Sequence, residues 1–192
     1  MKVLVACEFS GIVREAFRRN GHDAWSCDIV SDESEDSRHH IQTDVLTILD
    51  QGWDLMIAHP PCTYLSNSGA RWIHDKRFPE RVRHREEAVD FFMRLYNAPI
   101  PRICVENPVG YISTIFRKAD QIVHPWMFGH GEKKRTCLWY QNLPHLVPTN
   151  IVSERIPKIY TARRSENRGK LRSISYPGMA EAMAEQWGTL ND

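Results

Sequence analysis

Apolar and polar residues follow one another along the chain in blocks that predict strands and helices in turn. Four short apolar runs are typical of buried strands and cover residues 2–6, 23–29, 53–58 and 102–105. Three segments with apolar side chains at helical spacing predict helices, at residues 12–19, 79–97 and 177–187. The strands and helices therefore alternate over much of the sequence.

This alternation indicates an α/β fold with a doubly wound, mostly parallel, Rossmann-like sheet. Near the carboxyl end of the chain, residues 121–128 and 135–140 flank a basic loop that contains glycine, which predicts an antiparallel hairpin. The polar, acidic stretch at 31–43 is expected to be a loop. In sheets of this kind, functional side chains gather at the carboxyl ends of the strands.

Length and charge narrow the possible classes of protein. A chain of 192 residues is expected to form a single domain, since domains average about 150 residues. Its 25 basic and 24 acidic residues leave no strong overall field for a polyanion. The first apolar run is too short for a signal peptide or a membrane span, so we expect a cytoplasmic protein with no membrane partner. Five scattered cysteines without a CxxC pair favour neither disulfides nor a metal site.

Two strand ends carry residues suited to covalent chemistry. Cys62 follows two prolines, which would hold its thiol at the rim of the sheet as a nucleophile, although most cysteines are simply buried. Glu106 ends the next strand and is followed by an amide side chain. The two could face each other across the crevice, one attacking a ring carbon while the other binds the polar edge of the ring.

Cys62 and Glu106, in this order and context, resemble the cytosine-5 methyltransferases that use S-adenosylmethionine. The match extends over most of the chain, with one gap. The chain therefore resembles a small, bacteriophage-like member of that family. Four motifs carry the resemblance: Phe9-Ser10-Gly11, Pro60-Pro61-Cys62, Glu106-Asn107 and Ile174-Ser175-Tyr176-Pro177. Three positions depart from the family pattern, namely Val13 in place of a turn glycine, Thr63 in place of glutamine, and His59 before the two prolines.

The resemblance implies that S-adenosylmethionine is the cofactor. Asp28 would hold its ribose hydroxyls, and Asp44 would accept a hydrogen bond from the adenine amino group. The full set of implied cofactor-binding residues is Phe9, Ser10, Gly11, Asp28, Ile29, Asp44, Pro60 and Ser175.

The resemblance also implies a covalent mechanism in which Cys62 adds to carbon 6 of cytosine. Glu106 would stabilise charge at ring nitrogen 3, which calls for a raised pKa in a dry pocket. Arg135 completes the implied catalytic set, and with its neighbours it would supply cations for a phosphate. The implied substrate-binding residues are Pro61, Asn107, Lys133, Lys134, Arg163 and Arg164.

The gap in the resemblance bears on the substrate. Family members that recognise a DNA sequence carry a target-recognition domain, whereas this chain has only a short basic insert at 141–172. So short an insert is poorly suited to holding a duplex, which favours a free cytidine or deoxycytidine nucleotide as the substrate. DNA, with little or partner-supplied sequence specificity, is the first alternative. A non-catalytic nucleotide- or cofactor-binding module is the second.

Overall fold

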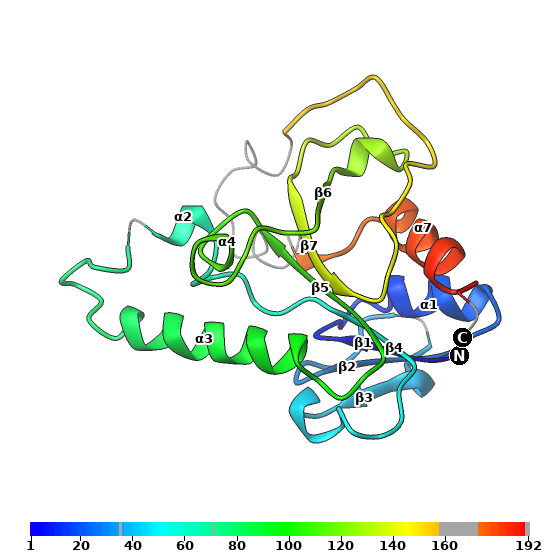
Figure 1. Cartoon of the computed structure of the whole chain (residues 1–192), viewed down its shortest axis with the longest axis horizontal. Helices are drawn as coiled ribbons and strands as arrows, with labels where there is room; N and C mark the ends of the chain where they lie inside the picture. Colours follow the sequence, from blue (N-terminus) through cyan, green and yellow to red (C-terminus); the bar gives the residue numbers. More distant parts are fainter. Residues whose placement is uncertain (35, 71, 158–172, 191–192) are drawn as a thin grey trace.

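A mostly parallel sheet forms the centre of the computed structural model, which describes residues 1–34, 36–70, 72–157 and 173–190 (Figure 1). The strands of this described part are β1 (Lys2–Ala6), β2 (Asp23–Asp28), β3 (His40–Gln42), β4 (Leu55–Ala58), β5 (Arg102–Pro108), β6 (Gln121–Val123) and β7 (Thr136–Gln141). They are ordered β3-β2-β1-β4-β5-β7-β6. β1 to β5 pair in parallel, and β7 runs antiparallel to both β5 and β6. The α/β class and the antiparallel pair are thus confirmed.

Helices cover both faces of the sheet. α1 (Ile12–Arg19) and α7 (Pro177–Trp187) pack together on one face, and α3 (Arg81–Tyr96) covers the other (Figure 1). Successive side chains of a strand point to opposite faces, so Val3 and Val5 face α1 and α7, whereas Leu4 and Ala6 face the α3 layer. The shorter helices are α2 (Asn67–Ala70) and α4 (Ile112–Ile115), with 3₁₀ turns η1 (Ser37–His39), η2 (Val45–Thr47) and η3 (Pro125–Met127).

Several predicted boundaries differ from the structure. β4 and α3 are two or three residues shorter than expected, and β6 covers only the first three residues of 121–128. Two further differences arise from pairing between strands. The segment expected to be a loop at 31–43 contains β3, which pairs with β2 and is further tied to it by a contact of 2.9 Å between Ser26 Oγ and His40 Nδ1. β5 was expected to end at residue 105 but extends to Pro108. It does so because β7 supplies partners for its last residues, and proline is tolerated at the end of a strand.

Part of the predicted insert falls outside the described residues. Residues 158–172 are not described, and Arg163 and Arg164, the two substrate-binding residues expected in the insert, are among them. Within the part of the chain that the structure does describe, no helix has both the length and the apolar composition to cross a bilayer.

Candidate active site

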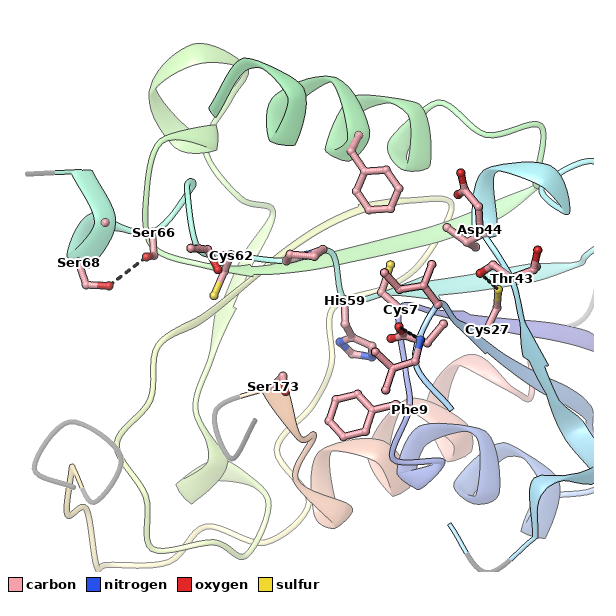
Figure 2. A pocket seen from close by; sticks show the side chains of 18 of the residues that line it. Cys7, Phe9, Cys27, Thr43, Asp44, His59, Cys62, Ser66, Ser68 and Ser173 are labelled. Atoms are coloured by element: carbon pink, nitrogen blue, oxygen red, sulfur yellow. Dashed lines mark hydrogen bonds between the residues drawn. The ribbon is translucent and has the colours of Figure 1, made fainter. Parts of the chain in front are cut away.

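A cavity of about 790 Å³ lies at the carboxyl ends of β1, β2 and β4 (Figure 2). Its volume is in the range of sites that bind small molecules and cofactors. Six of the residues implied by the family resemblance line it: Phe9, Asp28, Ile29, Asp44, Pro61 and Cys62. In Figure 2, Cys62 lies at one side of the cavity and Asp44 at the other, with His59 and Phe9 between them.

The turn from β1 into α1 is closed by a buried carboxylate. Glu8 is only 4% exposed, and its carboxylate accepts hydrogen bonds from the backbone N–H of Val13 (2.7 Å) and of Arg14 (3.2 Å). It thereby satisfies two of the unpaired N–H groups at the start of the helix. Ser10 donates a longer bond of 3.4 Å to the same carboxylate. Burial raises the pKa of Glu8, and the charge of His59 and these backbone bonds only partly offset that effect.

Gly11 is needed at this turn for two reasons. Its φ of 69° is in the left-handed region, and a Cβ there would lie 2.7 Å from Nη2 of Arg14 and 2.9 Å from Cβ of Ser34. Val13, which stands where the family has a second glycine, is buried in the core beneath the turn. The turn therefore keeps its shape with a single glycine.

A fully buried arginine, which no sequence pattern indicated, holds the loop after β2 in place. Nη1 of Arg14 donates to Ser26 Oγ and to Asp32 Oδ2, both at 2.8 Å. Nη2 donates to Ser34 Oγ at 2.6 Å and to the carbonyl of Asp36 at 2.8 Å. The first residues of this loop, Ile29 and Val30, line the cavity, whereas Arg14 does not. The guanidinium therefore helps to shape the cavity from outside it.

Two carboxylates and an apolar side chain lie at the far end of the cavity from Cys62. Oδ1 of Asp28 accepts from the N–H of Val30, and Oδ1 of Asp44 accepts from the N–H of Leu46, each at 3.0 Å. Within the described residues, no hydrogen bond reaches the second oxygen of either carboxylate. Ile29 lines the same end and is 74% exposed, which is unusual for a large apolar side chain.

Cys62 lies in a tight turn between β4 and α2. Its carbonyl accepts from the N–H of Leu65 (3.1 Å) and of Ser66 (2.9 Å). The turn is tied to the end of β5, because Nδ2 of the buried Asn107 donates to the carbonyl of Pro60 at 3.0 Å. Two motifs that are far apart in the sequence, Pro-Pro-Cys and Glu-Asn, are therefore joined by a direct hydrogen bond.

His59 connects the cavity to Glu106. Its Nδ1 lies 3.2 Å from Oε2 of Glu106, and the exposed fractions of the two side chains are 9% and 17%. Burial raises the pKa of Glu106, but the hydrogen bond from His59 and the charges of Lys134 and His59 outweigh it, so this pKa lies below its ordinary value. The expectation of a raised pKa at Glu106 was therefore wrong, because the sequence did not reveal the neighbouring cations.

Cys62 and Glu106 line different hollows with a common wall. Cys62 lines the main cavity, Glu106 lines a small pocket with Lys134 and Ser175, and His59 lines both. A third hollow, of about 640 Å³, is lined by the basic side chains of Lys133 and Arg135. It adjoins the main cavity, since both are lined by Ser66 and Ser68.

Comparison with known proteins gives a distant structural likeness. No protein-family model matches the chain, and no curated protein matches its sequence. One similar solved structure is described as a candidate DNA modification methyltransferase encoded within a prophage of E. coli. The identity is 15%, the TM-score is 0.45, and the match covers 78% of this chain and 51% of that one. The chain thus spans about half the length of that protein.

Proposed function

We propose that the chain is a methyltransferase that uses S-adenosylmethionine to methylate carbon 5 of cytosine, with Cys62 as the nucleophile. The observation that carries this proposal is a single cavity with two chemically different ends. One end has the carboxylates of Asp28 and Asp44 beside an exposed isoleucine, and the other has the thiol of Cys62. Glu106 is next to the cavity and is linked to it through His59.

The residues at the acidic end fit the cofactor. Asp28 and Asp44 each have an oxygen available to accept from ribose hydroxyls or from an adenine amino group. Ile29 offers an exposed apolar surface that would gain stability when covered by a planar base. Phe9 lines the cavity beside the β1–α1 turn, where the methionine end would lie. When bound, S-adenosylmethionine supplies an electrophilic methyl group.

The chain's own residues would activate the base. The thiolate of Cys62 adds to carbon 6, which makes carbon 5 nucleophilic, and Glu106 binds ring nitrogen 3 and the exocyclic amine. Once carbon 5 has been methylated, water accepts its proton, the electron pair of that C–H bond re-forms the 5,6 double bond, and the bond from sulfur to carbon 6 breaks to release the thiolate of Cys62. The bond from Asn107 to Pro60 keeps the nucleophile turn in place beside Glu106.

A free cytidine nucleotide is the first proposed substrate. Its phosphate would occupy the hollow that contains Lys133 and Arg135, which adjoins the cavity. DNA is the second candidate, and a particular observation favours it. Arg81, which lines the cavity, lies 4.9 Å from the ring centre of Tyr64, and Arg85 lies 4.3 Å from that of Tyr111. Such further cationic and aromatic surface suits a polynucleotide better than a mononucleotide.

Transfer of a tritiated methyl group tests the proposal. The donor is S-adenosylmethionine, and the acceptors are dCMP, dCTP, single-stranded DNA and duplex DNA. We expect transfer to at least one acceptor by the native protein, and none by Cys62→Ala. Calorimetry should show that this variant still binds the cofactor, which separates loss of chemistry from loss of fold.

The same panel separates the alternatives. Steep loss of activity with added salt identifies a polynucleotide, because binding a polyanion releases many counterions. If the native protein binds the cofactor but transfers methyl to no acceptor, the proposed activity is refuted and the chain is a non-catalytic module.

A further inference from the structure

We propose that His59 is a positioning residue that supplies, through Glu106, the proton required by ring nitrogen 3 of cytosine. This inference rests on the proposed function. It concerns a position where the chain departs from the family that it resembles, so the resemblance assigns His59 no role.

The geometry places His59 between the cavity and Glu106. Nδ1 of the imidazole faces Oε2 of Glu106 at 3.2 Å, and the histidine side chain is 9% exposed. The backbone N–H of His59 donates to the carbonyl of Ala6 at 2.9 Å, which fixes the residue at the end of β4. In the described part of the chain, its Nε2 is buried without a hydrogen-bond partner. A buried polar atom without a hydrogen bond lowers the stability of the fold, which favours a functional reason for a histidine at this position.

Charged and titratable groups surround the imidazole on several elements. Glu8 follows β1, Glu106 belongs to β5, and Lys134 precedes β7. Tyr176, before α7, lines the same small pocket. Burial raises the pKa of Glu8, and the charge of His59 acts against it, so the imidazole interacts with the buried carboxylate of Glu8 as well as with the partly buried one of Glu106.

The chemistry of the first step requires a proton at this location. As the bond from Cys62 Sγ to carbon 6 forms, the electron pair of the 5,6 double bond forms a new double bond between carbons 4 and 5. The electron pair of the 3,4 double bond moves onto nitrogen 3, which takes up a proton. Burial raises the pKa of Glu106, but the hydrogen bond from His59 and the charges of Lys134 and His59 lower it further than burial raises it. Glu106 is therefore ionised at neutral pH and has no proton of its own to give. The imidazolium form of His59 can donate a proton from Nδ1 to Oε2 and become the neutral imidazole. The proton passes from Oε2 to nitrogen 3, and release of Cys62 returns it along the same path.

Hydrogen exchange at carbon 5 tests this without the cofactor. In D₂O, carbon 5 takes up a deuteron while Cys62 is bonded to carbon 6, and it then loses its original proton as Cys62 is released. NMR detects the resulting deuterium on carbon 5 in dCMP and in a single-stranded oligonucleotide with one cytosine. The key variant is His59→Asn, because its side-chain amide can still donate to Glu106 but cannot transfer a proton. We expect exchange to slow by about 100-fold, as for loss of a general acid.

Matched variants separate this role from a structural one. His22→Gln changes a half-buried histidine just before β2, at the opposite edge of the sheet, and should exchange like the native protein. Glu106→Gln should be as slow as His59→Asn, and the double variant should be no slower, because the two residues act as one unit. Unchanged binding of S-adenosylmethionine by His59→Asn would show that the cavity is intact.

The outcomes distinguish the two proposals. Absence of both exchange and methyl transfer in the native protein refutes the proposed function. Native-like exchange in His59→Asn refutes only the role of His59. Multiplied losses in the double variant would also overturn it, because they would show that His59 and Glu106 act independently.

Discussion

Replacing Arg14 by methionine tests how much the buried guanidinium contributes to stability. Methionine keeps an unbranched apolar stem but removes the donors to Ser26, Ser34 and Asp32. The side chain of Asp32 is only 2% exposed, so its charge would remain buried without a cation. Breaking a buried pair in this way costs about 3–5 kcal/mol, and we expect the lower end because Ser34 still donates two bonds to Asp32.

The assay is thermal unfolding at neutral pH. A loss of about 3 kcal/mol lowers the Tm of a protein of this size by roughly 6–12 °C. The matched control is Arg18→Met on the same helix, whose partly exposed side chain lies 3.9 Å from Glu15 and should cost less than about 1 kcal/mol. Equal Tm values for the two variants would refute the reasoning.

The effect should also depend on pH. Burial raises the pKa of Asp32, but hydrogen bonds from Ser34 and Arg14 outweigh it and hold this pKa below its ordinary value. A carboxyl with a lowered pKa contributes stability above its unfolded pKa, near 3.9, and loses it as the pH falls through the folded value. The difference in free energy of unfolding between the native protein and Arg14→Met should therefore become smaller as the pH falls into the acid range.

Three further substitutions test separate parts of the site. Gly11→Ala should lower the free energy of unfolding by about 1–3 kcal/mol because of its left-handed φ, and further because its Cβ would clash with Arg14. Gly21→Ala also has a left-handed φ but meets open space, so it should lose less, and denaturant unfolding compares the two variants. Asp28→Asn should weaken binding of S-adenosylmethionine by about 10-fold or more, measured by calorimetry, because it removes a charged acceptor. Asn107→Ala should slow methyl transfer while leaving cofactor affinity unchanged, because it removes the side-chain bond that holds the Pro60 carbonyl against β5; unchanged turnover would contradict this.

Strong local patterns were sufficient to predict much of the fold. α1 and α7 have the bounds expected from their helical spacing, and for α7 a proline marks the first turn. β3 was missed because its three residues lie in a polar stretch and are ordered by pairing with β2, which no local pattern encodes. The extension of β5 likewise depends on β7, which is distant in the sequence.

The position of the cavity could be inferred, but its internal contacts could not. Parallel pairing brings the carboxyl ends of β1, β2 and β4 to one edge, so residues that follow these strands were expected there. The contact between His59 and Glu106 joins positions 47 apart, and Arg14 bonds to residues up to 22 positions away. Such partners depend on how two loops meet in space, and each residue alone looks like an ordinary polar position.

The loop after β4 is linked by three hydrogen bonds to the end of β5 and to the loop that follows it. Nδ2 of Asn107 donates to the carbonyl of Pro60, the N–H of Tyr111 donates to the carbonyl of Leu65 at 2.7 Å, and the N–H of Asn67 donates to the carbonyl of Val109 at 3.4 Å. The last two bonds form the bridge between Ser66 and Gly110, and Gly110 has no room for a side chain. The loop that carries the thiol must therefore move together with the end of β5, which carries the carboxylate of Glu106. Entry of a large substrate would require the opposite side of the cavity to move. A crosslink between the loop after β4 and the loop after β5 should therefore leave turnover unchanged.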